Sequence, residues 1–280
     1  MSRVTTELRR TTDRHVTVDG IGLHYNDVGT GPVILCTHGG GPGATAWGTL
    51  SSAIPLFACD FRLLLLDLPN FGASDKHVRI GERRPDEFVA ELSARFLDAV
   101  GITGPVSYYS SSGGAPGALR FALDHPDRVH RVVAQAFAPG MTPQRDSPGH
   151  RATALFAECP THEAMEHLFD LFVPDPARRT AEAVTARWEA ATAPGHLTSR
   201  GELARLADSA ALAEELGALE AEVLFLWGAD DGIVPVERVL TALRTVPRAQ
   251  AHIWGDRTGH LVPFEQPAAF TRVVRDFLLA

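Results

Sequence analysis

The sequence has few cysteines and no long apolar run, and each absence removes a class of protein. The three cysteines, Cys36, Cys59 and Cys159, are widely spaced and odd in number, which indicates reduced thiols and not a disulfide framework. No apolar run approaches the length needed to span a bilayer, and the polar N-terminal segment lacks the apolar stretch of a signal peptide. We therefore expect a cytoplasmic protein with no membrane partner.

Positive charge is also scarce, with 26 Lys and Arg against 34 Asp and Glu and a formal net charge of −8. The basic residues are scattered, so they do not form the stripe that nucleic-acid binding needs. The length of 280 residues, 45% of them hydrophobic, is enough for one large domain with an inserted lid. We expect a small-molecule substrate as the partner, and leave a homo-oligomer open.

Short, dense apolar runs alternate with helical patterns along most of the chain. Such runs are typical of strands buried on both faces of a mostly parallel sheet. Before them, residues 15–29 alternate apolar and polar around Asp19-Gly20, which predicts an antiparallel hairpin on a two-residue turn. The sequence therefore predicts an α/β sandwich, with helices at 86–101 and 267–280. The predicted parallel strands are 32–38, 62–69, 106–110, 131–137, 223–228 and 251–255.

One region breaks this alternation of strand and helix. From about 139 to 207 there is no strand pattern, but several helical stretches punctuated by proline and glycine. We predict that 1–138 and 208–280 form the core and that 139–207 is a helical cap. A cap over the ends of parallel strands would wall a ligand pocket, because pockets in such sheets open there. A helical subdomain without function is the alternative.

A glycine-rich segment, HGGGPGATAW at 38–47, directly follows a predicted strand. Its glycines let the backbone turn sharply and approach a ligand, and their amide groups suit an oxyanion. A phosphate-binding loop would end in Gly-Lys-Ser/Thr, which is absent. The segment favours an oxyanion loop, with a plain glycine-rich turn as the alternative.

The segment YSSSGGAPGALRFALDHP has the strand–turn–helix context of a nucleophile elbow. An elbow serine occupies a strained backbone conformation, so small residues must flank it. If the nucleophile were Ser111, bulky Tyr109 would occupy the first tight position. If it is Ser112, the flanking residues are Ser110 and Gly114, both small. The spacing favours Ser112, while Ser111 and a serine-rich turn without catalysis remain alternatives.

An acid and a base follow in the chain order Ser–Asp–His. WGADDGIVP comes after a predicted strand and offers Asp230 and Asp231, of which Asp231 fits the usual loop better. GDRTGHLVPFEQP follows the last strand and offers His260. His260 would take the serine proton, and Asp231 would fix the tautomer of its ring. A favourable Asp-Gly turn and a surface histidine are the alternatives.

No metal ion or cofactor is expected from the sequence. HEAMEH at 162–167 places its second histidine one residue too far for the H-E-x-x-H zinc helix. The ten histidines other than His38 and His260 show no ligand cluster. We therefore predict no metal and no cofactor.

The segments HGGGPGA…W, DLPNFGASDK at 67–76, the elbow and WGADDGIVP together resemble the meta-cleavage product hydrolases. These are enzymes of the α/β-hydrolase fold that hydrolyse carbon–carbon bonds in ring-fission products of aromatic compounds and steroids. The resemblance implies Ser112 as the nucleophile and the amides of Gly40 and Gly113 as the oxyanion hole. It also implies that Arg187, in the cap, binds the dienolate or carboxylate end of the substrate.

The chain departs from this family at positions that shape the substrate site. Ser111 and Thr49 stand where the family has asparagine, and Leu261 stands where it often has tryptophan. We expect substrate contacts from Gly41, Thr49, Ser111, Arg187 and Leu261. The leading expectation is hydrolysis of a carbon–carbon bond in a dienone or diketone. The alternatives are an esterase, lactonase or thioesterase acting on a small or polyketide-like ester, and a degenerate hydrolase that only binds its ligand.

Overall fold

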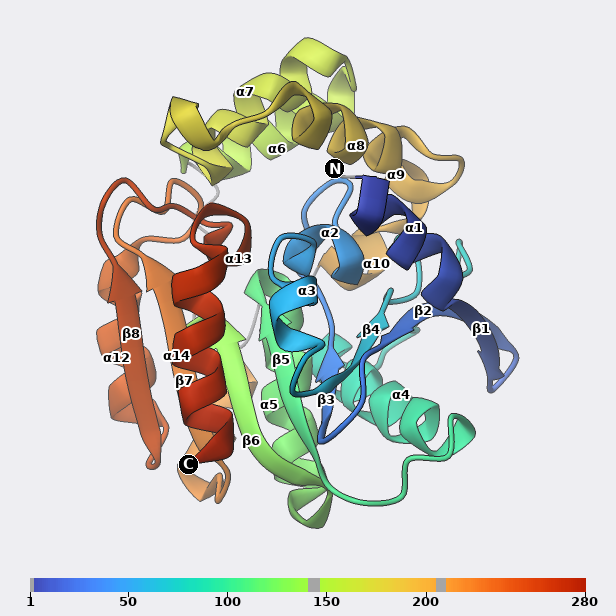
Figure 1. The fold of residues 1–280 in the computed structure, drawn as a ribbon, viewed down its shortest axis with the longest axis vertical. Coiled ribbons are helices and arrows are strands. Elements are labelled where there is room, and N and C mark those ends of the chain that lie inside the picture. The colour runs from blue at the N-terminus through green and yellow to red at the C-terminus, as the bar shows by residue number, and fades with distance from the viewer. Residues whose placement is uncertain (1–2, 141–146, 205–209) are drawn as a thin grey trace.

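The fold is built on one eight-stranded sheet, shown in Figure 1, and the computed structural model describes residues 3–140, 147–204 and 210–280. The strand order is β1-β2-β4-β3-β5-β6-β7-β8. β2 pairs antiparallel with β1 and β4, and the other pairs are parallel. This confirms the predicted mostly parallel sheet. The strands are β1 (Asp13–Val18), β2 (Ile21–Val28), β3 (Val33–Cys36), β4 (Arg62–Leu66), β5 (Val106–Ser111), β6 (Val129–Gln135), β7 (Glu222–Gly228) and β8 (Ala249–Trp254).

The antiparallel hairpin turns where the sequence predicts. Asp19 and Gly20 form its two-residue loop with φ of 51° and 81°. Two successive positive φ angles are the pattern of a type I′ turn, whose twist matches that of the flanking strands. The register that this turn sets places His15 directly opposite His24.

Helices cover both faces of the sheet, which is why the central strands are continuously apolar. Along β4, Leu63 and Leu65 join one core cluster, while Leu64 and Leu66 join the other. The first face is covered by α1 (Arg3–Thr12), α2 (Ala46–Leu50), α3 (Ile54–Phe57), α13 (Val262–Glu265) and α14 (Pro267–Leu279). The second face is covered by α4 (Pro85–Ala99), α5 (Ala115–Asp124), α11 (Ala210–Glu215) and α12 (Val239–Thr245).

The prediction of burial on both faces is wrong for β8. This strand forms one edge of the sheet, and Ile253 is 45% exposed. Trp254 is buried at the end of the strand, where it packs with α14. The segment therefore contacts the core only in part, through Ala251 on one face and Trp254 on the other, while His252 and Ile253 are exposed.

Between β6 and β7 the described part of the chain forms only helices. Figure 1 shows α6 to α9 lying across one end of the sheet, over the carboxyl ends of the parallel strands. These helices enclose a separate small core that includes Phe156, Met165, Leu168 and Phe169. The predicted cap boundary at 207 lies outside the described residues. The helices are α6 (Pro148–Glu158), α7 (His162–Phe172), α8 (Ala181–Thr192), α9 (His196–Ser199) and α10 (Gly201–Ala204).

None of the helices in the described ranges has the length and apolar character that crossing a membrane requires.

Candidate active site

The turn between β5 and α5 holds Ser112 in a strained backbone conformation. β5 ends at Ser111, and a short 3-10 turn from Ser112 to Gly114 leads into the helix. Ser112 has a φ of 48°, in the left-handed region that residues with a side chain rarely adopt. Ser111 has an ordinary extended φ of −124° and is buried in the sheet. The strain thus falls on the serine that the small-residue spacing favours.

The glycine-rich loop packs directly against this turn. A Cβ on Gly39 would lie 3.0 Å from the Cβ of Ser112. A Cβ on Gly114 would lie 2.1 Å from the carbonyl oxygen of His38, which no side chain would tolerate. The loop backbone therefore reaches Ser112 only because these positions lack side chains.

His38 anchors the glycine-rich loop. The amide of Leu68 donates to Nε2 at 3.0 Å, so Nδ1 carries the proton and donates to the carbonyl of Gly39 at 2.8 Å. Burial lowers the pKa of the fully buried His38, which keeps the ring neutral. Sequence reasoning placed His38 at the start of the loop but missed this anchoring role.

Asp231 and His260 form a buried pair beyond the ends of β7 and β8. Nδ1 of His260 lies 2.8 Å from Oδ2 of Asp231, and their side chains are 6% and 0% exposed. The other oxygen, Oδ1, accepts the amides of Ile233 and Val234 at 2.8 and 2.9 Å. Asp230 is exposed, so the structure favours Asp231 as the partner. With Nδ1 donating to the carboxylate, Nε2 is left to accept a proton.

Two residues that sequence reasoning missed fix the backbone of His260. The side-chain amide of Gln135, at the end of β6, donates to the His260 carbonyl at 2.8 Å. The Gln135 oxygen accepts the hydroxyl of Tyr109 at 2.8 Å, which ties the histidine loop to β5. From the cap side, the carbonyl of Phe172 accepts the His260 amide at 2.8 Å. Neither Gln135 nor Phe172 belongs to a motif, so no local signal marks them.

Glu265 fixes the loop that carries His260. Its buried carboxyl group accepts the amide of Gly259 at 3.0 Å and that of Leu261 at 3.2 Å, on either side of His260. Burial raises the pKa of Glu265 to about 7, against the lowering effect of these hydrogen bonds. Glu265 lies in the segment GDRTGHLVPFEQP, but nothing in its spacing distinguishes it from a surface acid.

Arg187, in α8, brings a positive charge to the glycine-rich loop. Its guanidinium carbon lies 4.4 Å from the ring centroid of Phe172, and a Cβ on Gly41 would lie 3.2 Å from Nη2. Its Nε has no hydrogen-bond partner, and no acid in the described ranges forms an ion pair with it. Burial lowers the pKa of Arg187 to about 10. A half-buried cation that no acid of the described residues neutralises is a suitable group for binding an anion.

The other predicted site residues take varied positions. Thr49 is buried in α2, and its hydroxyl donates to a carbonyl of its own helix at 2.9 Å. Leu261 packs against the small core between helices α6, α7 and α8. The carbonyl of Gly40 accepts a hydrogen bond from Arg200 at 3.2 Å. Gly113 lies within the 3-10 turn that begins at Ser112.

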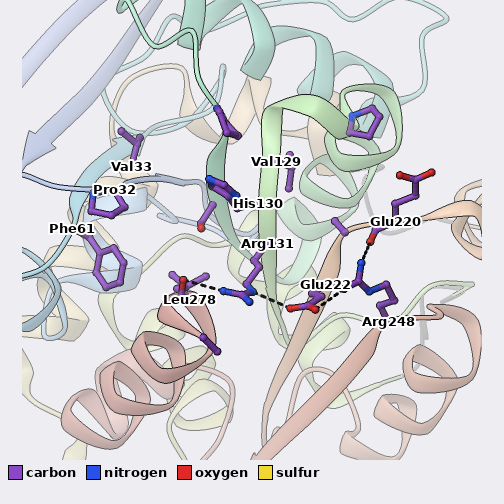
Figure 2. A pocket seen from close by; sticks show the side chains of 15 residues that line it. Pro32, Val33, Phe61, Val129, His130, Arg131, Glu220, Glu222, Arg248 and Leu278 are labelled. Carbon is purple, nitrogen blue, oxygen red and sulfur yellow. Dashed lines mark hydrogen bonds and ion pairs between the residues drawn. The ribbon is translucent and has the colours of Figure 1, made fainter.

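A pocket of about 680 Å³ opens at the other end of the parallel strands, where they begin (Figure 2). Arg131 and Arg248, two of its charged residues, both pair with Glu222, at 2.9 and 2.6 Å. These charges pair with one another. The strands β5 and β7 that begin there lead to Ser112 and Asp231 at the far end of the sheet. This pocket is therefore separate from the candidate site.

Comparison with known proteins agrees with this geometry. A family model described as "alpha/beta hydrolase fold" matches residues 32–267. The chain is 33% identical to a 2-hydroxy-6-oxo-6-phenylhexa-2,4-dienoate hydrolase of Burkholderia cepacia, over 96% of both chains. It is 32% identical to a 2-hydroxy-6-oxononadienedioate/2-hydroxy-6-oxononatrienedioate hydrolase of Burkholderia vietnamiensis, over 95% of this chain and 96% of that one.

Among solved structures, a meta-cleavage product hydrolase of Pseudomonas fluorescens superposes with a TM-score of 0.83 at 28% identity, covering 94% of this chain and 96% of that one. Fold and matches together define a hydrolytic enzyme. The chain belongs to the alpha/beta hydrolase fold family. The resemblance to the meta-cleavage product hydrolases is confirmed by these relatives.

Proposed function

We propose that this hydrolase cleaves a carbon–carbon bond in a dienone or diketone product of aromatic ring fission. Ser112, His260 and Asp231 form its catalytic triad in this proposal. The observation that carries it is the half-buried guanidinium of Arg187 beside the glycine-rich loop, which forms no ion pair with an acid of the described residues. An ordinary acyl substrate has no need of a half-buried cation there, whereas a dienoate ends in an anion.

The order of strands supports the triad. β5, β6, β7 and β8 are successive parallel neighbours, so the segments that follow them all leave the sheet at the carboxyl ends of the strands. Ser112 follows β5, Asp231 follows β7 and His260 follows β8. Ser111 pairs in register with Gln135, whose side chain bonds the His260 backbone. This chain of contacts brings the histidine loop toward the serine.

The chemistry follows from these positions. His260 Nε2 removes the proton of Ser112 Oγ, or of a water, which attacks the substrate ketone. The amides of Gly40 and Gly113 stabilise the oxyanion that forms on the ketone oxygen. Collapse of this intermediate breaks the carbon–carbon bond, and the electron pair leaves on the conjugated fragment, to which His260 returns the proton. Where Ser112 attacked, a water activated by His260 then hydrolyses the acyl-enzyme, which releases the carboxylic acid and the free serine. Asp231 stabilises the imidazolium between these steps.

Arg187 has a defined role in this scheme. The departing fragment is a delocalised enolate, so its negative charge develops on oxygens at the far end of the conjugated chain. A guanidinium held there can pair with two oxygens at once. Such hydrogen bonds to charged groups contribute about 1.5–3 kcal/mol. Arg187 is thus proposed to stabilise the leaving group while Gly41 leaves room beside it.

We also propose that residues 139–207 act as the cap over this site, and that the enzyme works in the cytoplasm on a small molecule. Helices α6 to α9 supply both Phe172 and Arg187 from above the sheet. The substrate is therefore enclosed between these helices and the turn that carries Ser112. Leu261, which packs against the cap core, is proposed to line the same space.

An esterase, lactonase or thioesterase is the second candidate, and one observation favours it. The hydroxyl of Thr49 donates within its own helix, and Ser111 is buried in β5. Neither offers the side-chain amide that the carbon–carbon hydrolases carry at these positions. A site with fewer polar groups fits a simpler acyl substrate.

The test compares a coloured ring-fission dienone with a nitrophenyl ester. We expect the wild-type enzyme to bleach the dienone and Ser112→Ala to leave the colour unchanged for many turnover times. Mass spectrometry should find the two carbon–carbon cleavage products in equal amounts. Rapid hydrolysis of the ester with no loss of dienone colour would overturn the proposal in favour of the esterase. A binder without activity would turn over neither compound.

A further inference from the structure

The hairpin β1–β2 carries three side chains that hydrolysis does not use. Asp13, His15 and His24 each offer a ligand atom, and these atoms all lie within 4.8 Å of one another. His15 faces His24 across the two strands, and Asp13, two residues before His15, lies on the same face of β1. Sequence analysis found no ligand cluster among these histidines, because only the register of the hairpin brings them together.

The separations between these atoms suit a tetrahedral metal ion. Oδ1 of Asp13 lies 3.2 Å from Nε2 of His24 and 3.5 Å from Nε2 of His15. Bonds of about 2.0–2.1 Å at tetrahedral angles place neighbouring ligand atoms about 3.3–3.4 Å apart. An ion at the centre would thus meet all three atoms after a small rotation of His15, which is 64% exposed.

Asp67 already holds His24 in the orientation of a metal ligand. Its Oδ2 lies 2.8 Å from Nδ1 of His24, and its Oδ1 accepts the amide of Ala46 at 3.0 Å. The side chains of Asp67 and His24 are 3% and 4% exposed. A carboxylate on one ring nitrogen fixes a histidine so that the other nitrogen faces the ion, the arrangement found around ligating histidines. His24 therefore needs no rearrangement to bind.

We propose that Asp13, His15 and His24 bind a divalent transition-metal ion, with water completing its shell. Two imidazoles and one carboxylate suit zinc, cobalt or nickel, whereas magnesium and calcium prefer oxygen ligands alone. β1 is the terminal strand of the sheet, and β2, β4 and β3 lie between it and β5. The ion therefore stabilises the hairpin and takes no part in the reaction at Ser112.

Cobalt provides the direct test, because a tetrahedral cobalt ion with nitrogen and oxygen ligands absorbs visible light. The protein is dialysed against a chelator and then titrated with Co²⁺, and zinc is added to displace the cobalt. We expect one ion to bind per chain with a visible band that zinc abolishes. We also expect zinc, but not calcium, to raise the temperature of unfolding.

Variants locate the ion. His15→Ala changes an exposed side chain, so the fold should survive, and the dissociation constant should rise more than about tenfold. Asp13→Asn should also raise the dissociation constant. His130→Ala changes an exposed histidine of β6, four strands away from β2, and is the matched control, which should bind as the wild type does. The proposal is overturned if no ion binds, or if His15→Ala and His130→Ala bind equally well.

Discussion

Replacing Arg187 with methionine separates the role of its charge from the role of its packing. Methionine keeps an unbranched apolar stem over Phe172 but removes the guanidinium. Burial lowers the pKa of Arg187 from 12.5 to about 10, which corresponds to a destabilisation of the folded free enzyme on the order of 3 kcal/mol. Arg187→Met removes this cost, so its free energy of unfolding should equal or exceed that of the wild type.

Activity should change in the opposite direction. If the guanidinium pairs with the anionic end of a dienone, its loss removes about 1.5–3 kcal/mol of binding to the transition state. At about 1.4 kcal/mol per decade, kcat/KM for an acidic dienone should fall about ten- to a hundredfold. A neutral nitrophenyl ester should be turned over at nearly the wild-type rate, and serves as the control substrate.

Steady-state kinetics on both substrates and thermal unfolding of the same preparations check this reasoning. Equal losses on both substrates would assign Arg187 a structural role. Unchanged kinetics on the dienone would remove the main support for carbon–carbon bond cleavage. A fall in stability would contradict the claim that this charge forms no ion pair in the free enzyme.

Three further predictions concern the proposed catalytic groups and the loop that carries His260. Ser111→Ala should keep most of the activity that Ser112→Ala abolishes, and a loss confined to Ser111→Ala in steady-state assays would reverse the assignment. His260→Ala and Asp231→Asn should each lower kcat by orders of magnitude, measured at saturating substrate; full activity in His260→Ala would place the base elsewhere. Because burial raises the pKa of Glu265 to about 7, its contribution to stability is complete below about pH 4.5 and is lost as the pH rises through 7. Melting temperatures from pH 5 to 8 should therefore fall more steeply for the wild type than for Glu265→Gln, and parallel curves would refute this.

Local patterns were sufficient to predict the central strands and the tight turn between β5 and α5. The continuous apolar run of β4 requires helices on both faces, and both layers are present. The preference for Ser112 over Ser111 came from the size of the flanking residues, and the positive φ falls on Ser112. In both cases the residues that decide the structure are neighbours in the sequence.

The features that the sequence did not predict depend on contacts between distant segments. Gln135 acts on His260 only because β6 ends beside the histidine loop. The exposure of Ile253 depends on which strand lies at the edge of the sheet, and its apolar character alone does not determine this. His15 and His24 look unrelated along the chain, and the hairpin register makes them neighbours.

Phe172 links the position of α7 to the orientation of the proposed base. Its carbonyl accepts the amide of His260, its ring lies 5.5 Å from the imidazole, and the same ring supports Arg187. Any movement that lifts the end of α7 away from the sheet must break the first contact and weaken the other two. With α7 lifted, His260 would be less firmly held and Arg187 would be displaced. In that state the enzyme would hydrolyse a substrate such as a simple ester poorly. A substrate that contacts α7 and α8 would favour the state in which all three contacts are formed, so its binding energy would also order the proposed base.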